Sequence, residues 1–318
     1  MTTVDCLSVG ILVADHLCAP IARLPAAGEL ILTDHLLLNI GGCASNAATD
    51  LARLGVKVGV VGCVGDDVFG QFIVETLSKS GVDVADIRCA AGVGTSGTLI
   101  VNVRGQDRRF IHTLGANAEL TVEDIPLERA RQAKVLYVGG YLLMPALAPE
   151  GLVELFRAAR AAGTKTVLDI VLPGPGDHWP RLKDLLSETD LFMPNCDEAA
   201  TITGIDDPLR QAEYFHTAGA DTVVITCGKQ GAVLINDRVR LRAGCYPTQY
   251  VGGTGAGDAF DAGYITGLLA GADPRGCLEW GSALGASCVR SIAATDSVFT
   301  REEAAAFIRQ HELPIEEI

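Results

Sequence analysis

Positive charge, paired cysteines, aromatic residues and long apolar runs are all scarce in this chain of 318 residues. Its 39 Asp and Glu outnumber its 25 Lys and Arg, and the net charge of −14 argues against nucleic acid or an anionic membrane as the main partner. The ten cysteines form no Cys-x-x-Cys pair, which favours buried, reduced thiols in a cytosolic setting over a zinc or redox motif. We expect neither a membrane span nor a signal peptide, because the apolar runs are short and no basic segment precedes the first of them.

The composition and the order of elements are those of an α/β protein. Hydrophobic residues make up 48% of the chain, enough for a large buried core. Periodicity predicts strands at 4–13, 56–63, 135–138, 165–169, 191–193 and 222–226, and helices at 43–54, 69–80, 149–162, 179–187, 197–203, 208–218, 256–270, 274–292 and 301–310. This alternation predicts a doubly wound, mostly parallel sheet with helices on both faces, in one domain over residues 1–318.

Two stretches, at about 11–38 and 95–113, break the alternation. The first contains an expected strand at 29–38, and the second an expected hairpin with strands at 97–103 and 109–113 around Gly105-Gln106-Asp107. Together they predict a small β-sheet that stands off the main domain. A lid that excludes water during transfer chemistry and an ordinary extension of the main sheet explain this pattern equally well.

The segment most suggestive of chemistry runs from Gly252 to Asp258, where small residues directly precede a helix. Without side chains, the backbone can approach a ligand closely, and the first N–H groups of the helix point at whatever lies in front. The helix dipole adds about half a positive charge there, which suits phosphate and the charge that builds during phosphoryl transfer. Asp258 in the first turn is placed to accept a proton from an attacking hydroxyl.

Other interpretations of this segment remain. A glycine-rich turn whose Asp258 merely caps a helix is the ordinary structural explanation. A P-loop would end in Gly-Lys-Ser or Gly-Lys-Thr, and neither occurs in the chain. A dinucleotide fingerprint normally follows the first strand of its unit, whereas this segment lies near the C-terminus.

The segment resembles the second signature of the ribokinase-like, or PfkB-type, carbohydrate kinases, whose usual form is Asp-Thr-x-Gly-Ala-Gly-Asp. Three other motifs of this family are matched, and all of them fall in family order. The first signature is matched by Gly41-Gly42-Cys43-Ala44-Ser45-Asn46 together with residues 62–70. The Asn-x-x-Glu motif is matched by Pro194-Asn195-Cys196-Asp197-Glu198, and the nucleotide loop by Thr226-Cys227-Gly228-Lys229-Gln230-Gly231. The resemblance spans most of the chain. It implies the ribokinase-like fold and phosphorylation of a hydroxyl on a small sugar-like substrate, with ATP and Mg²⁺.

The resemblance also implies roles for the matching residues. Asp15, at the end of the first expected strand, and Asn46 would bind substrate hydroxyls, and Gly42 would let the substrate lie close to the backbone. Cys43 and Tyr141 are further candidates on the substrate side. Asn195 and Glu198 would organise magnesium and the triphosphate. Thr226, Gly228 and Gly231 would border the nucleotide, Gly255, Ala256 and Gly257 would form the anion hole, and Asp258 would be the base. The small sheet would be a lid through which the family often dimerises.

Each role has a plain structural alternative. Asp15 could be a turn residue at a strand end, and Asn46 an ordinary residue of a helical first turn. Glu198 could be an exposed helix residue, although Mg²⁺ prefers oxygen ligands and one nearby carboxylate suits it. Thr226 could be a plain strand residue, and Tyr141 is as consistent with the core or a rim as with a substrate cavity.

The chain departs from the family pattern at several positions. Gly252-Gly253 replaces the usual Asp-Thr, whose Asp helps to hold a monovalent cation in ribokinase-type members, and Ala293 stands where many members have Gly. We therefore expect little dependence on potassium. Cys43 stands where ribokinases often have Lys. Arg108, Arg109 and His112 in the expected hairpin could reach an acidic group of a substrate, although a solvated strand face is the commoner arrangement.

Three other functions compete with a sugar kinase. A nucleoside kinase of the same fold would need an aromatic or apolar surface for the base, and only 5% of the residues are aromatic. A non-catalytic nucleotide-binding homologue would have kept the fold without turnover. An NAD-dependent oxidoreductase would need a glycine fingerprint after the first strand, which the chain lacks. The sequence names neither the sugar nor the hydroxyl that is phosphorylated.

Overall fold

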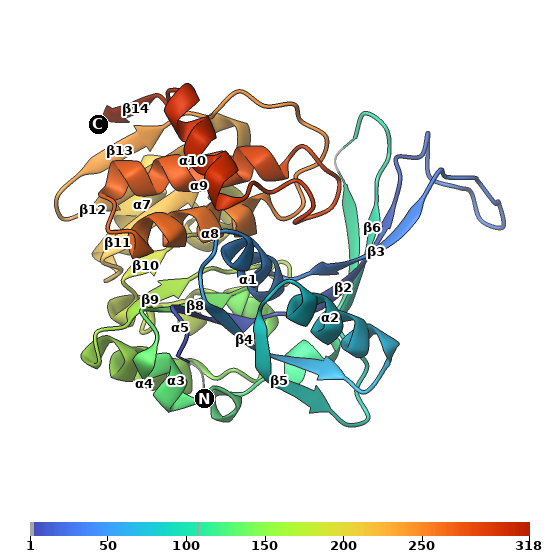
Figure 1. Cartoon of the computed structure of the whole chain (residues 1–318), viewed down its shortest axis with the longest axis horizontal. Helices are drawn as coiled ribbons and strands as arrows, with labels where there is room; N and C mark the ends of the chain where they lie inside the picture. The colour runs from blue at the N-terminus through green and yellow to red at the C-terminus, as the bar shows by residue number, and fades with distance from the viewer. Residues whose placement is uncertain (1–2, 107) are drawn as a thin grey trace.

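The computed structural model describes residues 3–106 and 108–318, and shows a large sheet covered by helices beside a small, separate sheet (Figure 1). The large sheet has ten strands in the order β14-β13-β12-β11-β10-β9-β8-β1-β4-β5. They are β1 (Cys6–Gly10), β4 (Val58–Gly65), β5 (Asp83–Ala90), β8 (Val135–Gly139), β9 (Lys165–Leu168), β10 (Leu191–Phe192), β11 (Thr222–Thr226), β12 (Ala232–Asn236), β13 (Arg240–Ala243) and β14 (Ile315–Glu317). Strands β5 to β11 of this order run parallel, and β12 to β14 join antiparallel at one edge.

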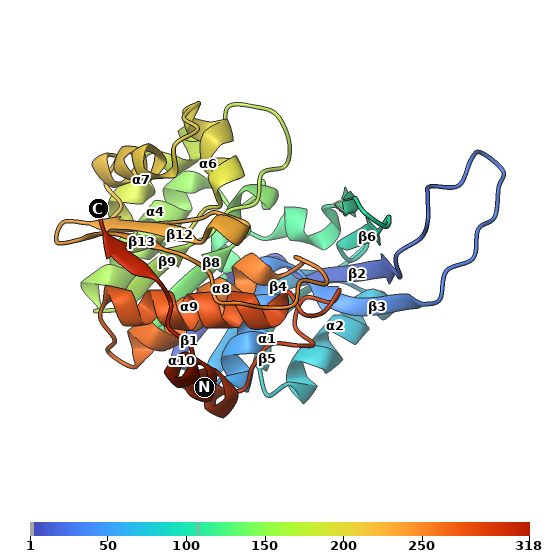
Figure 2. The ribbon, with the colours of Figure 1, turned by 90° about the horizontal axis from the view of Figure 1, so that it is seen from above.

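Helices cover both faces of the large sheet, as Figure 2 shows. Helices α1 (Cys43–Arg53), α2 (Val68–Lys79), α8 (Ala256–Leu269), α9 (Pro274–Cys288) and α10 (Arg301–Gln310) lie on one side, and α3 (Leu127–Gln132), α4 (Pro149–Ala161), α5 (Trp179–Leu182), α6 (Cys196–Thr203) and α7 (Pro208–Thr217) on the other. Successive residues of β8 pack into different cores: Leu136 and Val138 on one face, Val135 and Tyr137 on the other. This burial on both faces explains why the parallel strands are apolar throughout. The doubly wound fold is confirmed.

The small sheet has the order β3-β2-β6-β7 and comprises β2 (Val13–Cys18), β3 (Leu36–Gly41), β6 (Gly97–Val101) and β7 (Arg109–Thr113). It stands beside the main body, on the right in Figure 1. The predicted hairpin at 97–113 is present as the antiparallel pair β6–β7. Asp107 of its predicted turn lies outside the described residues.

One register row of the small sheet is polar and the next is apolar. Asn39, Asp15, Thr98 and His112 are neighbours across the four strands in the first row. Leu38, His16, Leu99 and Ile111 are neighbours in the second row. Because successive side chains of a strand point to opposite faces, the two rows lie on opposite faces of the sheet.

The predicted single strand at 4–13 is wrong, because it consists of parts of two strands in different sheets. β1 ends at Gly10, where φ is 148° and a Cβ atom would lie 2.1 Å from the carbonyl oxygen of Gly139. The chain then crosses to the small sheet, and the Asn117 side chain bonds both backbone groups of Leu12 at 3.0 Å. Asp15 therefore lies within β2, and not at the end of the first strand.

Other element boundaries also differ from the predictions. The strand predicted at 29–38 is β3, which begins at Leu36, so most of that stretch belongs to an exposed connection. The helix predicted at 179–187 ends at Leu182 and is followed by a 3₁₀ turn at Leu186–Glu188. The helix predicted at 274–292 ends at Cys288. Strands β5, β12, β13 and β14 were not predicted. None of the helices within the described ranges has the length and apolarity to cross a membrane.

Candidate active site

The glycine-rich segment forms the N-terminal end of α8. Gly255 is the N-cap residue with a φ of 78°, and no side chain caps the first turn. A Cβ atom on Gly255 would lie 2.6 Å from Cβ and 2.7 Å from the carbonyl oxygen of Ala294, so the loop is packed against the segment that follows α9. This arrangement leaves the helix N-terminus open to an anion, as expected for Gly255, Ala256 and Gly257.

A cavity of about 670 Å³ lies in front of this helix end. Its lining includes Ala256 and Gly257 from α8, and Thr226, Gly228 and Gly231 from the end of β11 and the turn after it. The structure thus brings two residues of the predicted anion hole and three of the predicted nucleotide residues to one cavity, whereas Gly255 and Asn195 are not among its lining residues. Arg108 and Lys229 also line it and supply positive charge. Its aromatic lining residues are Tyr246, Tyr250 and Phe260.

Asp258 lies in the first turn of α8, next to α1. The amide Nδ2 of Asn46 donates to its Oδ2 at 2.7 Å. Burial raises the pKa of Asp258, while the hydrogen bonds from Asn46 and Cys43 lower it. The carboxyl group is therefore held in place by uncharged donors, an arrangement that would suit the predicted general base.

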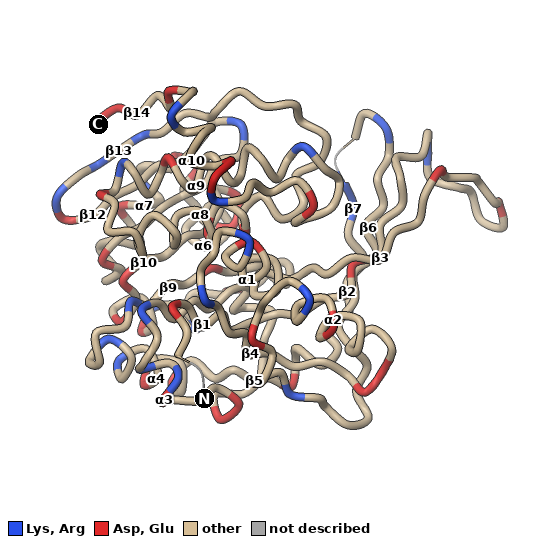
Figure 3. Tube along the Cα trace, in the orientation of Figure 1, with Lys and Arg blue, Asp and Glu red and all other residues tan. Residues whose placement is uncertain are grey.

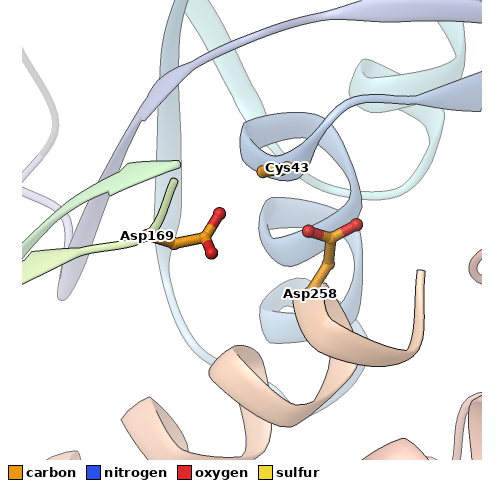
Figure 4. Close-up of side chains that lie close together, drawn as sticks. All are labelled: Cys43, Asp169 and Asp258. Atoms are coloured by element: carbon orange, nitrogen blue, oxygen red, sulfur yellow. The ribbon is translucent and has the colours of Figure 1, made fainter. Parts of the chain in front are cut away.

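Asp169, which directly follows β9, faces Asp258, and Cys43 at the start of α1 lies beside both (Figure 4). One ligand atom from each of these three residues lies within 4.8 Å of the other two. Burial raises the pKa of Asp169 well above its usual value, and the negative charges of Glu198 and Asp258 add to the shift. Sequence reasoning missed Asp169, although its place at the carboxyl end of a parallel strand was a usable signal.

Asp15 meets Gly41 at the end of β3, where the small sheet leads into α1. A Cβ atom on Gly41 would lie 2.0 Å from Oδ2 of Asp15, and one on Gly42 would lie 2.4 Å from the carbonyl oxygen of Ile11. The Asp15 side chain therefore lies directly against Gly41, whereas Gly42 packs against the backbone of Ile11. Its burial raises the pKa of Asp15 to about 7, against a lowering by the hydrogen bond from Thr98. The repulsion from Asp258 adds a small further increase to this pKa, which places the two carboxyl groups in one electrostatic environment.

Tyr141 is fully buried and does not line the cavity. The guanidinium carbon of Arg181 lies 5.0 Å from the centre of its ring. These contacts fit a core residue better than a residue on the substrate side, which were the two interpretations of Tyr141 that the sequence left open.

Asn195 and Glu198 form a capping box at the start of α6. Oδ1 of Asn195 accepts from the backbone N–H groups of Asp197 at 3.0 Å and of Glu198 at 2.9 Å, and Oε2 of Glu198 accepts from the N–H of Asn195 at 3.0 Å. Burial raises the pKa of Glu198 to about 7, and Asp258 contributes to this shift. Glu198 therefore belongs to the same acidic group as Asp258 and Asp169, although its Oε2 accepts the capping hydrogen bond at the start of α6.

Arg108 was predicted as a residue of the hairpin that could reach an acidic group of a substrate, and the structure places it beside the glycine-rich loop. A Cβ atom on Gly253 would lie 2.5 Å from Nη1 of Arg108, so the guanidinium group of this residue, which directly precedes β7, touches the glycine-rich loop. Residues more than 140 positions apart in the chain meet here, which periodicity cannot show. Arg109 instead bonds Gln106, and His112 bonds Thr98.

Comparison with known proteins shows the family to which this chain belongs. Residues 5–301 match the model of the pfkB family carbohydrate kinases. The chain is 29% identical over 307 residues to the ribokinase of Haemophilus influenzae, covering 94% of this chain and 97% of the relative. It is 31% identical over 281 residues to the 2-dehydro-3-deoxygluconokinase of Bacillus subtilis, covering 85% of this chain and 86% of the relative. It is 31% identical over 234 residues to the aminoimidazole riboside kinase of Salmonella typhimurium, covering 71% of this chain and 72% of the relative.

Solved structures show the same fold. The ribokinase of Arabidopsis thaliana, solved with ribose and ATP, matches with a TM-score of 0.82 at 24% identity over 97% of this chain and 99% of the other. A ribokinase II structure from E. coli with ATP and Mg²⁺ matches with a TM-score of 0.80 at 21% identity, covering 97% of this chain and 100% of that chain. The chain belongs to the PfkB family of carbohydrate kinases, and it is a phosphotransferase.

Proposed function

We propose that this enzyme transfers the γ-phosphoryl group of ATP to a hydroxyl of a small sugar, with Asp258 as the base. The observation that supports this most is the position of Asp258. It lies in the first turn of α8, whose N-terminus opens onto the cavity lined by the nucleotide candidates, and it bonds Asn46 from the substrate side. A hydroxyl held near Asp258 would therefore face a phosphoryl group held at the helix end.

ATP fits the cavity in volume and in chemistry. Thr226, Gly228 and Gly231 border one part, and the end of α8 borders another. A Cβ atom on Gly231 would lie 1.9 Å from the carbonyl oxygen of Ala243, so this turn needs glycine to stay closely packed. Arg108 and Lys229 supply the cations that a triphosphate requires in a strongly acidic protein. In this proposal Gly255, Ala256 and Gly257 stabilise the charge that develops on the transferred group.

Mg²⁺ fits the donors near Glu198. The carboxyl groups of Glu198, Asp169 and Asp258 interact electrostatically, and hard oxygen ligands of this kind are those that Mg²⁺ prefers. The capping bond occupies Oε2 of Glu198 and leaves Oε1 for a ligand. We propose that Glu198, with Asn195 beside it, would hold the metal through water. When bound, the metal would supply positive charge against the phosphates.

Asp15, Gly42, Cys43 and Asn46 would form the sugar side. Asp15 and Asn46 are buried, with exposed fractions of 6% and 3%, and both offer hydrogen-bonding atoms toward the space around Asp258. Cys43 contributes an uncharged thiol where a Lys would add a cation. Hydroxyl groups, which both donate and accept, match this set of acceptors and amides.

The experiment that tests the proposal is ADP release from ATP and magnesium across a panel of neutral sugars, sugar acids, sugar phosphates and nucleosides. Turnover with a sugar that Asp258→Asn loses would support it. Turnover confined to nucleosides would favour the second candidate, a nucleoside kinase, which the likeness to a riboside kinase and the aromatic side chains of Tyr246 and Tyr250 in the cavity support. Nucleotide binding without turnover on any compound would favour a non-catalytic homologue.

We predict equal turnover in potassium and in sodium at fixed ionic strength. Gly252 is packed so closely that a Cβ atom would lie 2.9 Å from the carbonyl oxygen of Ser291 and 3.1 Å from Cα of Ile292. The loop therefore has no room for the carboxylate that holds a monovalent cation in related kinases. Initial rates in the two chlorides measure the effect, and a large increase with potassium would contradict the prediction.

We propose that the small sheet is a lid over the sugar site and also the interface of a homodimer. The polar row with Asp15 lies on the face where the Asp15 side chain meets Gly41, while the opposite face has exposed apolar side chains. On that face the exposed fractions are 78% for Leu36, 45% for Leu99 and 66% for Ile111. Asp15 and Arg109 are the charged residues of the four strands, and Figure 3 shows how few charges they carry. An exposed apolar patch of this kind marks an interaction surface.

This proposal predicts that Leu99→Lys with Ile111→Lys converts a dimer to a monomer, because two buried charges would oppose association. Light scattering at micromolar concentration measures the mass. Leu127→Lys is the matched control, since Leu127 is an equally exposed leucine, at 44%, on α3 of the main body. A monomeric wild-type protein, or a double variant that stays dimeric, would show that this face is not the interface.

We also infer a cytoplasmic location and small-molecule partners, without nucleic acid or membrane. Ten free thiols suit a reducing compartment. The net charge of −14 suits small-molecule chemistry better than binding to polyanions.

A further inference from the structure

The carboxylate of Asp169 is built into the candidate active site, yet the function proposed above gives it no more than an electrostatic part beside the Mg²⁺ site. Its backbone carbonyl accepts from the N–H of Tyr141 at 3.2 Å, and its Oδ2 accepts from the N–H of Gly140 at 3.2 Å. Asp169 is thus fixed between the ends of β8 and β9, and its carboxylate faces that of Asp258 across a short gap (Figure 4).

The two carboxylates repel each other when both are charged. Ligand atoms of Cys43, Asp169 and Asp258 lie within 4.8 Å of one another. The groups of the described chain that bond these carboxylates are the Asn46 amide, the Gly140 N–H and the Cys43 thiol, all of them uncharged. A fold that keeps two facing carboxylates without an adjacent cation sacrifices stability, and such a cost is usual at sites that bind a ligand.

An independent feature of Asn46 also indicates a ligand. This residue is 3% exposed, and its Nδ2 donates to Asp258 at 2.7 Å. Its Oδ1 is buried and has no hydrogen-bond partner within the described chain. A buried amide oxygen without a partner carries a desolvation cost, which a donor on a bound molecule would remove.

The site therefore offers acceptors in excess, namely Oδ1 of Asn46 and the free oxygens of Asp169 and Asp258. A neutral sugar is the complementary ligand, because each of its hydroxyls donates one hydrogen bond. Since the two carboxylates lie so close together, hydroxyls on adjacent carbons can reach both. A carboxylate or phosphate on the substrate at this place would add a third negative charge and meet repulsion.

We propose that Asp169 is a substrate-positioning residue that accepts a hydrogen bond from the hydroxyl adjacent to the one phosphorylated. The substrate is then a neutral polyhydroxy compound with hydroxyls on two neighbouring carbons. Asp169 holds one of these hydroxyls, so that the other is oriented toward Asp258. This inference rests on the proposed sugar kinase function.

The test uses the best neutral sugar from the panel and its deoxy analogue, which lacks the neighbouring hydroxyl. For wild type we expect kcat/KM to be roughly 10- to 100-fold lower with the deoxy analogue, as for a buried acceptor that is left without its donor. Asp169→Asn should show a similar loss with the parent sugar and no further loss with the analogue. Its KM for ATP should stay as in wild type, which a general structural defect would not give. Asp237→Asn, at a 94% exposed side chain, is the control and should behave as wild type.

Three outcomes would overturn the inference. In the first, Asp169→Asn keeps its kcat/KM for the sugar while Asp258→Asn loses turnover, which leaves the kinase function intact. In the second, the wild-type enzyme uses the deoxy analogue as well as the parent sugar, a result that needs no variant to fold. In the third, a divalent cation binds the sugar-free protein in calorimetry and Asp169→Asn abolishes that binding, which would make the pair a metal site. Failure of all sugars in the ADP assay would instead reject the proposed function.

Discussion

Asp258→Asn is expected to lower kcat by roughly 10²- to 10⁴-fold, the usual contribution of a general base. Asparagine keeps the shape of the side chain and a partner for Asn46, but it cannot accept the proton of the attacking hydroxyl. The KM for ATP should change little, because the N–H groups at the start of α8 are unaltered. Steady-state ADP release with the best substrate of the panel measures both constants.

The variant should also be at least as stable as wild type. Burial raises the pKa of Asp258, so the folded protein carries a cost for the charged form that asparagine does not have. A melting temperature equal to or above that of wild type would therefore separate loss of the base from loss of the fold. Turnover close to that of wild type would show that Asp258 is not the base, and the catalytic assignment would fail.

The second large effect is expected at Gly255. Alanine there would have a positive φ and would place its Cβ atom 2.6 Å from that of Ala294. The strained φ costs about 1 kcal/mol and the overpacking about 1–3 kcal/mol of the free energy of unfolding. The loop must shift to relieve the contact, which displaces the N–H groups that stabilise the transferred phosphoryl group in the proposed function. Displacing one such donor lowers kcat by roughly 10²- to 10³-fold.

Gly81→Ala is the matched control for this prediction. Gly81 has a φ of 85° and no heavy atom within 4 Å of the added Cβ, so only the backbone strain remains. We expect a loss of about 1 kcal/mol in urea denaturation and an unchanged kcat. Equal losses of stability in the two variants would mean that the packing of Gly255 against Ala294 does not fix the loop.

The sequence predicts best where the cause of a structure is local. The first turn of α8 follows from glycines before an apolar helix, and β11 and α10 have their predicted bounds because apolar periodicity and turn residues coincide there. The crossing at Gly10 could not be predicted, since it depends on the carbonyl of Gly139 and on the side chain of Asn117. β5 was missed because its residues are mostly half-buried or exposed, which weakens the apolar pattern of a strand.

The residues of the candidate site also fall into those that the sequence predicts and those that only the structure reveals. Motif residues such as Gly255 and Asp258 are recognisable because the chemistry needs them within one short segment. Asp169 and Arg108 are recognisable only in three dimensions, because each meets the site from another element. The position of Asp15 was predicted in the wrong strand, although the structure places it against Gly41 near the start of α1.

The two faces of the small sheet have a consequence for how this enzyme can diversify. Asp15 and His16 are neighbours in β2, yet they belong to rows on opposite faces. Inserting or deleting a single residue within β2 would exchange these faces and turn the Asp15 row outward. The lengths of these strands are therefore constrained in descendants of this chain, whereas the exposed stretch at 22–30 in the connection between them can gain or lose residues freely. New substrates would then arise by substitution along the Asp15 row, and new shapes of the sheet edge by changes in that connection.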